Sequence, residues 1–252
     1  MSDVKDFFNS KNTVYEISQE DLNQKEKYLE AIYAFARTTY KSIYVIDYKE
    51  KGFEYVSENP LFLCGHSALE VKEMGYEFYF KHVPESDLEL LLKINKVGFE
   101  FYDSIPMEER KYATISYDFH LKNNEGKTIL INQKLTPIFL TKEGKVWKCV
   151  CIISLSNEKN SGNIRIYNTK TNKIVEYDLK GNFWRTPNKI ELNKREKEIL
   201  QLSIRGYTIN EVAHKIYLSP DTVKYHRKNL FEKLEVSNMS EAIISATNNR
   251  LI

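Results

Sequence analysis

The chain lacks the sequence features of secreted, membrane-spanning and strongly charged proteins. It has three cysteines and a formal net charge of +2 in 252 residues, and no apolar run approaches the ~18 residues that a membrane helix needs. The first residues, MSDVKDFFNSKN, lack the apolar core of a secretory signal. The small net charge argues against general binding of polyanions, so any nucleic-acid binding must depend on where the charges lie. We therefore expect a cytoplasmic protein without a membrane segment.

The three cysteines do not form a recognisable metal-binding or catalytic motif. An odd number of cysteines in no zinc-binding spacing is typical of a reducing cytoplasm. Cys149 and Cys151 alternate onto one face of a predicted strand, where two thiols supply too few ligands for a metal. A thiol enzyme would pair Cys64 with His66 or His82, but nothing in the sequence supplies the third group that orients such a base. We expect neither a metal site nor an enzyme.

Helix-start signals are frequent near the C-terminus. A capping residue followed three positions later by Glu satisfies the first free backbone donors of a helix, and proline is tolerated at the first helical position. Gly206 separates the first two helices, because glycine ends a helix without strain. Four short helices are therefore predicted between Leu192 and Ile252. Their start signals are Asn193 with Glu196, Thr208 with Glu211, Ser219 with Pro220, and Ser237 or Asn238 with Glu241.

The third of these helices has a basic and aromatic outer face. At about 100° per residue, a helix with Val223 at the centre of its buried face carries Lys224 on one flank, with Tyr225 and Lys228 nearly opposite. Lysine can donate to guanine N7 and O6, and an aromatic ring can touch a thymine methyl group. Lys224, Tyr225 and Lys228 are therefore the predicted contacts to base edges.

Other polar residues of the same helix are suited to the DNA backbone. His226 and Lys233 lie on the second flank, and with Thr222 they are predicted to contact phosphates, which give affinity without sequence discrimination. Arg227 lies close to the buried face, from which its long side chain can reach around to the DNA. A solvated basic surface helix is the alternative. A capped helix and a tight turn precede this helix, and that order favours a helix-turn-helix.

The segment from Leu192 to Ala246 resembles the LuxR-type helix-turn-helix of the NarL/FixJ class of bacterial regulators, above all through the stretch LSPDTVKYHRKNLFEKL. The resemblance implies a four-helix domain whose third helix enters the major groove of double-stranded DNA. It also implies a dimer contact on DNA through the fourth helix, Met239 to Asn249. We expect a homodimer, whose contact can lie in the N-terminal helix, in the PAS-like sheet or in this last helix. Asn193 stands where threonine is usual in the family. The matching residues are Leu192, Arg195, Glu196, Ile199, Leu200, Gly206, Thr208, Glu211, Val212, Ala213, Ile216, Leu218, Ser219, Thr222, Val223, Lys224, His226, Lys233, Leu234 and Val236.

The front of the chain alternates strand patterns with helices. Residues 1–41 are predicted as an N-terminal helical segment, with a helix from Ser18 to Thr39 whose apolar stripe suits packing on a partner. A long helix is predicted from Ser86, its expected cap, to Asp103. Strands are predicted at Ile43–Asp47, Phe53–Ser57, Tyr112–Leu121, Thr128–Leu140 and Val146–Leu155, with short helices and turns at Asn59–Glu73.

This order of elements resembles a PAS domain over residues 42–156, with loose support from YVSENPLFLCGHS and HVPESD. The predicted fold class is α+β: a PAS-like antiparallel five-stranded sheet with helices, followed by an all-α tetrahelical helix-turn-helix domain at residues 189–252. Residues 157–188 are predicted as a hairpin and linker between them. A response-regulator receiver is not expected, because the front half lacks the strand–helix alternation of a parallel sheet.

The PAS resemblance implies a small cavity between sheet and helices, where a ligand can bind. Cys64 lies in FLCGHS, which does not match the reactive-cysteine motif of flavin photoreceptors, and the predicted long helix offers no histidine to haem. His66 and His82 are interpreted as structural, and Trp147, Phe119 and Tyr117 as core. We predict no cofactor, with haem and flavin disfavoured. The signal can be an unknown small molecule or a protein, or the cavity can be unused.

Together these patterns predict a transcription regulator in which the PAS-like domain controls a LuxR-type DNA-binding domain. A signal that binds one arrangement of the protein more tightly would shift the population toward it. The alternative is an interaction protein. In that case the PAS-like domain binds a partner or dimerises, and the C-terminal domain only tethers the complex to DNA.

Overall fold

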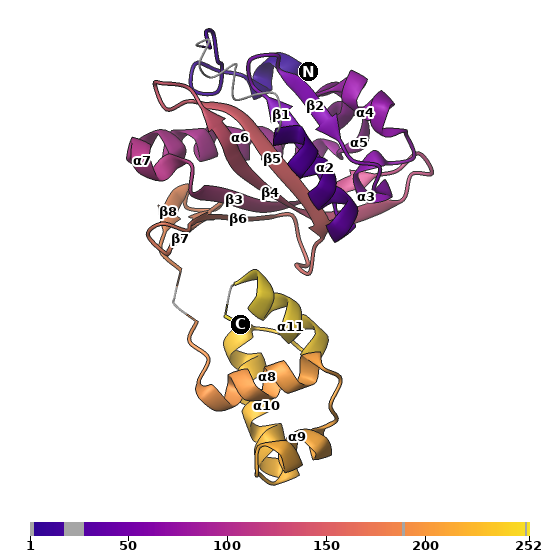
Figure 1. The fold of residues 1–252 in the computed structure, drawn as a ribbon, viewed down its shortest axis with the longest axis vertical. Coiled ribbons are helices and arrows are strands. Elements are labelled where there is room, and N and C mark those ends of the chain that lie inside the picture. The colour runs from indigo at the N-terminus through magenta and orange to yellow at the C-terminus, as the bar shows by residue number, and fades with distance from the viewer. Residues whose placement is uncertain (1–2, 18–27, 188–189, 250) are drawn as a thin grey trace. The chain divides into compact units, whose positions relative to one another are not determined.

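The computed structural model of this chain describes residues 3–17, 28–187, 190–249 and 251–252. Contacts divide the chain into two units, Met1–Pro187 and Asn188–Ile252. The first unit is built around a β-sheet and the second consists of helices (Figure 1). The predicted α+β class, with an antiparallel sheet followed by an all-α domain, is confirmed.

One antiparallel sheet of eight strands organises the first unit, in the order β2-β1-β5-β4-β3-β6-β7-β8. Five strands are those predicted: β1 (Ser42–Asp47), β2 (Gly52–Val56), β3 (Ala113–Lys122), β4 (Thr128–Leu140) and β5 (Val146–Leu155). Between β2 and β3 the chain forms α3 (Pro60–Leu63), α4 (Ala68–Met74), α5 (Glu77–His82), α6 (Glu85–Ser104) and α7 (Met107–Arg110). This is the element order expected of the PAS-like domain.

Three further strands extend the predicted five-stranded sheet: β6 (Gly162–Asn168), β7 (Lys173–Asp178) and β8 (Phe183–Arg185). Residues 157–188 were predicted as a hairpin and linker between domains. The hairpin is present, but it forms part of the sheet instead of a linker. Its strand β6 pairs antiparallel with β3, which places Ile166 opposite Ile115. Ile164 and Ile166 are buried in the core of the first unit. The hairpin therefore covers the edge of β3, which would otherwise expose unpaired backbone groups.

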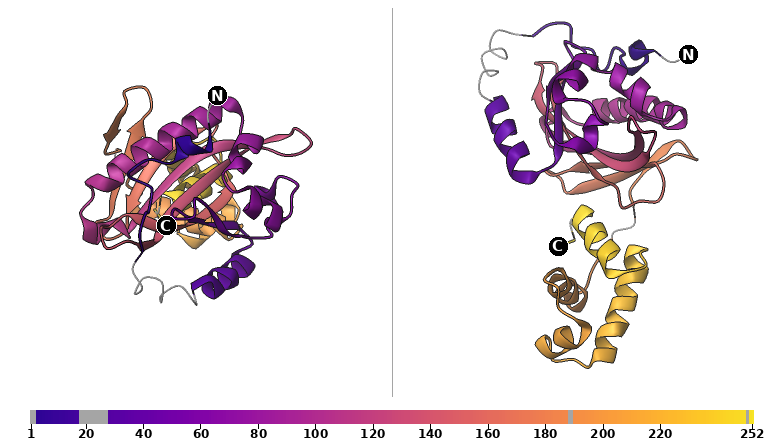
Figure 2. Two further views of the ribbon diagram at one scale, coloured as in Figure 1. Left: turned by 90° about the horizontal axis from the view of Figure 1, so that it is seen from above. Right: turned by 90° about the vertical axis from the view of Figure 1, so that its right-hand side faces the viewer.

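The two faces of the sheet carry different helices. The long helix α6 lies over one face, and α2 (Tyr28–Thr39) lies over the other (Figure 2). α6 begins directly after Pro84, which makes no side-chain cap, so the expected cap by Ser86 is wrong. Glu85 and Asp87 in the first turn instead complement the positive end of the helix dipole.

Ahead of the sheet, the chain forms the short helix η1 (Val4–Phe7) and then α2. The predicted helix from Ser18 to Thr39 is present from Tyr28 onward, and its residues 18–27 lie outside the described residues. Residues 3–17 belong to the predicted N-terminal helical segment, but no place in the core was predicted for them. Asp3 caps η1, and Phe7 is only 5% exposed because it enters the core beneath α6.

The second unit contains the four predicted helices: α8 (Lys194–Ile204), α9 (Ile209–Lys215), α10 (Pro220–Leu234) and α11 (Met239–Asn248). Their predicted caps are confirmed, with Asn238 rather than Ser237 capping α11. α10 packs against the other three helices. Its residues Leu230 and Leu234 join one apolar cluster with α8 and α11, and Val223 joins a second with α8 and α9.

Among the described helices, none is long and apolar enough to cross a membrane.

Candidate nucleic-acid interface and ligand cavity

The connection between α9 and α10 is short and tightly bonded. The Leu218 N–H donates to the Ala213 carbonyl at 2.9 Å, which closes the turn. The Ser219 hydroxyl then accepts from the Thr222 N–H at 3.1 Å and starts α10. Ala213 and Val223 are buried between the two helices, and the small alanine side chain permits their close approach. The chain therefore has the two-helix geometry of a helix-turn-helix.

The three residues predicted to contact bases all lie on the solvent side of α10. Tyr225 is 62% exposed, and the side chains of Lys224 and Lys228 are 61% and 76% exposed, whereas Val223 is fully buried. The helical projection thus placed these side chains correctly with respect to solvent. Their contact with bases stays a prediction.

Both lysines of this face have acidic neighbours on the same helix. Lys224 pairs with Asp221 at 2.9 Å, and the Lys228 Nζ lies 3.8 Å from the Glu232 carboxylate. Exposed pairs of this kind contribute only about 0–1 kcal/mol. These pairs would therefore be exchanged for DNA at little cost, and the two carboxylates would repel phosphates that approach them.

Two of the predicted phosphate contacts, Thr222 and His226, are partly buried, and so is Arg227. The Thr222 hydroxyl is hydrogen-bonded to the Ser219 hydroxyl at 2.8 Å, within the cap of α10. Arg227 lies over the Phe231 ring, with 5.7 Å from the guanidinium carbon to the ring centroid. His226 contacts the Tyr225 ring, and its Nδ1 is buried with no hydrogen-bond partner among the described residues. These side chains support the shape of α10 as well as flanking its outer face.

Lys233 has a partner that the sequence did not reveal. Its Nζ lies 2.9 Å from the carboxylate of Glu196, which is 1% exposed, and 3.3 Å from the Glu191 carbonyl. Glu196 belongs to the capping box of α8, so this ion pair ties α10 to the start of α8. The pair competes with the phosphate contact predicted for Lys233, and it gives this residue a role in the fold.

Tyr217 was missed as a candidate. It lies in the turn before α10, has the left-handed backbone angle φ 55°, and is 94% exposed. An aromatic residue among apolar ones would ordinarily be assigned to the core. Its position two residues before Ser219, the N-cap of α10, is the signal that could have identified it. Nothing in the described structure covers its ring, so it is available to a partner of this surface.

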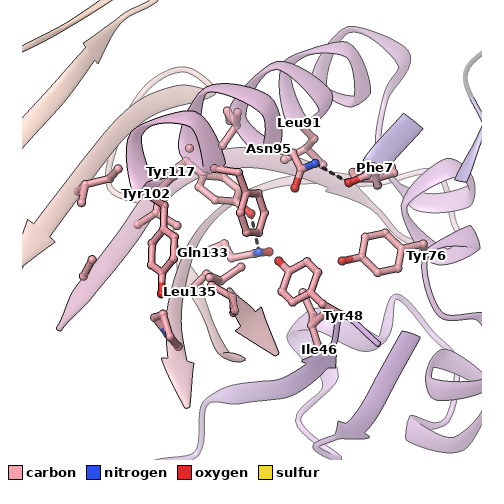
Figure 3. Close-up of a pocket in the computed structure, with 18 of the residues that line it drawn as sticks. Phe7, Ile46, Tyr48, Tyr76, Leu91, Asn95, Tyr102, Tyr117, Gln133 and Leu135 are labelled. Carbon is pink, nitrogen blue, oxygen red and sulfur yellow. Dashed lines mark hydrogen bonds between the residues drawn. The ribbon is translucent and has the colours of Figure 1, made fainter. Parts of the chain in front are cut away.

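The first unit contains a cavity between α6 and the inner face of the sheet, with a volume of about 80 Å³. Figure 3 shows Tyr117 and Gln133 in its middle, Tyr102 on one side, and Phe7 and Tyr76 on the other. Tyr117 was interpreted as core together with Trp147 and Phe119. All three are buried, and Tyr117 also lines the cavity.

Cys64, His66 and His82 are not arranged as a reactive group. Burial raises the pKa of the Cys64 thiol to about 12, which opposes formation of a thiolate. The Nε2 atoms of His66 and His82 lie 3.0 Å apart, and His82 Nδ1 lies 2.8 Å from the Lys122 carbonyl. The histidines thus bond to each other and to the backbone. Across the described parts of the chain, no group of three or more His, Cys, Asp or Glu residues is placed to hold a metal ion.

Comparison with known proteins agrees with the geometry of the second unit. The model of the luxR family of bacterial regulatory proteins matches residues 191–246, which span α8 to most of α11. This segment belongs to the luxR family. The LuxR-type domain accordingly combines a family-specific sequence with a capped helix-turn-helix and three exposed side chains on α10.

The matched relatives are transcriptional regulators. The chain is 31% identical over 139 residues to a probable csgAB operon transcriptional regulatory protein of Salmonella typhimurium, covering 51% of this chain and 63% of that protein. The structure of the transcription factor GerE is 37% identical and covers 23% of this chain and 85% of that one, with a TM-score of 0.22. A VqmA–ligand–DNA complex from Vibrio cholera covers 88% of both chains at 15% identity, with a TM-score of 0.33. The chain spans less than two thirds of the length of the curated relatives it matches.

Proposed function

We propose that this chain is a sequence-specific DNA-binding transcription regulator whose first unit senses a signal and controls the LuxR-type domain. The observation that carries the proposal is the outer face of α10, where Lys224, Tyr225 and Lys228 are exposed together directly after a capped helix-turn-helix. An α-helix fits the major groove, and these residue types match the donor and methyl pattern of base edges.

Variants of α10 test the DNA-binding part of the proposal. Lys224→Ala and Lys228→Ala should each reduce the ratio of specific to non-specific affinity by about 5- to 150-fold, since a good base contact contributes ~1–3 kcal/mol of discrimination. Fluorescence anisotropy at fixed salt measures both affinities. Lys197→Ala is the matched control, because Lys197 is an exposed lysine on α8. If the ratio of specific to non-specific affinity is the same for Lys224→Ala, Lys228→Ala and Lys197→Ala, the proposed role of α10 is contradicted.

We also propose that the protein acts as a cytoplasmic homodimer and that α11 contributes to the dimer on DNA. Ala242 and Ala246 face the domain core, while Ile244 on the other side of α11 is 45% exposed. The luxR resemblance of this segment implies a dimer contact through this helix, and Ile244 is an exposed apolar side chain there that would take part in it. Ile244→Glu should lower the cooperativity of binding to paired half-sites without changing the melting temperature. Sedimentation of the protein–DNA complex would distinguish one bound copy from two.

The sensing part of the proposal is supported by the cavity beneath α6. We propose that the unit works without haem or flavin, because the cavity of about 80 Å³ is smaller than an engineered cavity of ~150 Å³ that admits benzene. Haem and flavin are each several times larger than benzene. Absorbance spectra of the purified full chain would test this, and a Soret or flavin band would contradict it.

An alternative function is a protein-interaction module that is tethered to DNA and has no small-molecule ligand. Exposed aromatic residues favour it, since Tyr33 and Phe35 on α2 and the following Tyr40 remain accessible. Native mass spectrometry separates the two functions. A stoichiometric protein partner that is lost in Phe35→Ser would favour the interaction module, whereas a bound small molecule without a protein partner would favour the sensor.

A further inference from the structure

The cavity in the first unit is lined by uncharged and mostly apolar side chains. Its walls come from α6, from the inner faces of β1, β3, β4 and β5, from β6, and from Phe7 of η1. None of the described residues that line it carries a formal charge at neutral pH. A charged ligand would therefore lose its hydration without gaining a counter-charge, which is strongly unfavourable in an apolar site.

The phenol groups around the cavity are neutral. Burial raises the pKa of Tyr48, Tyr76 and Tyr117 well above the ordinary value for tyrosine, so these groups keep their protons. Tyr117 accepts a hydrogen bond from the Gln133 side-chain amide at 2.6 Å. Gln133 in turn accepts from Tyr44 at 2.9 Å. Most polar groups of the wall are thus occupied by one another, and they fix the shape of the site.

Tyr102 differs from these tyrosines. Its side chain projects from α6, only 8% of the residue is exposed, and burial raises the pKa of its phenol. Its hydroxyl is buried and has no hydrogen-bond partner among the described residues. A buried polar group without a partner costs about 1–3 kcal/mol. An acceptor atom on a bound molecule would remove this penalty, because the protonated phenol can donate to it.

We propose that this cavity binds an uncharged, largely apolar molecule of about one ring, whose hydrogen-bond acceptor receives the proton of the Tyr102 hydroxyl. The inference rests on the proposed sensing function of the first unit and specifies its ligand. The small volume limits the ligand to about one ring, and the uncharged wall favours a neutral ligand. The unpartnered Tyr102 hydroxyl requires a hydrogen-bond acceptor on the ligand. A carbonyl oxygen or a ring nitrogen satisfies all three conditions.

We infer that room for such a molecule comes from the wall formed by Phe7. The present volume is about 80 Å³, so a ring requires one wall to move outward. Phe7 belongs to residues 3–17, outside the sheet, and its carbonyl is held by the side-chain amides of Asn95 and Asn12, each at 2.6 Å. Asn95 also lines the cavity from α6 (Figure 3). Binding is thereby coupled to the position of the N-terminal segment.

Three fluorinated probes of similar size test the proposal by ¹⁹F NMR titration of the full chain. 3-Fluoropyridine has a ring nitrogen acceptor, fluorobenzene has the same shape without it, and 3-fluorobenzoate carries a charge. We expect saturable binding of 3-fluoropyridine about 3- to 10-fold tighter than that of fluorobenzene, which corresponds to one hydrogen bond. 3-Fluorobenzoate should not saturate.

Two variants assign the effect to residues. Tyr102→Phe removes only a hydroxyl that bonds to no described group, so it should fold normally and should bind 3-fluoropyridine and fluorobenzene equally. Phe7→Ala should enlarge the cavity and bind both probes several-fold more tightly. The proposal is overturned if the benzoate competes with 3-fluoropyridine, if wild type does not prefer the pyridine, or if Tyr102→Phe keeps that preference. Failure of DNA discrimination with intact probe binding would instead count against the regulator function alone.

Discussion

Replacement of Lys233 by alanine separates a role in the fold from a role in DNA binding. The substitution leaves the Glu196 carboxylate, 1% exposed, without the ammonium group 2.9 Å away. Breaking a fully buried pair costs ~3–5 kcal/mol. Here the Lys233 side chain is 41% exposed, and Glu196 keeps its hydrogen bond from the Asn193 N–H at 2.8 Å. We therefore expect a loss of about 1–2 kcal/mol, which lowers the melting temperature of this 188–252 unit by ~5–15 °C.

Calorimetry of the full chain measures this loss as a shift of the transition of the C-terminal unit. Lys228→Ala is the matched control, since Lys228 lies on the same helix and is 76% exposed, with Glu232 3.8 Å away. It should change stability by less than about 0.5 kcal/mol. A different pattern would refute this expectation: both variants melt at the same temperature, while Lys233→Ala weakens binding to all DNA sequences. In that case Lys233→Ala would also lower the slope of log affinity against log salt concentration by about one, which indicates a phosphate contact.

Three other substitutions test the core and the buried charges. Lys148→Ala leaves the buried Asp47 carboxylate, 3.0 Å from the Lys148 Nζ, without its cation, and should destabilise the first unit by ~3–5 kcal/mol in urea unfolding. Val223→Ala removes fully buried methyl groups from α10 and should cost ~2 kcal/mol in calorimetry. Burial lowers the pKa of His82, so its neutral form stabilises the fold above the ordinary imidazole pKa, and that stability is lost as pH falls through the lowered pKa. Below about pH 6.5, the free energy of unfolding of wild type, measured with urea, should fall by up to ~1.4 kcal/mol per pH unit more than that of His82→Gln. Parallel plots of unfolding free energy against pH for the two proteins would contradict this.

Local signals in the sequence predicted the second unit well. A capping pair such as Asn193 with Glu196 acts within one turn of helix, so neighbouring residues suffice to locate the start of α8. The helical period likewise separated buried Val223 from exposed Tyr225. In the first unit, alternation of apolar residues and short polar turns predicted the bounds of β4 and β5 as the structure has them.

Features that depend on distant parts of the chain were not predictable in this way. Lys233 and Glu196 are 37 positions apart, and only the packing of α10 on α8 brings them together. The pairing of β6 with β3 depends on which strand edge is free, and alternation in one segment does not contain that information. Phe7 enters the core from a short segment with no periodic pattern, so its place at the cavity could be found only from the fold.

We claim that α10 gives this chain sequence-specific DNA binding, and selection from random double-stranded DNA at fixed salt tests this claim most directly. Wild type should enrich one motif, as two half-sites about 10 base pairs apart if it binds as a homodimer. The double variant Lys224→Ala/Lys228→Ala should bind DNA with a similar salt dependence but enrich no motif. Absence of a motif for wild type, or the same motif for the double variant, would contradict the claim.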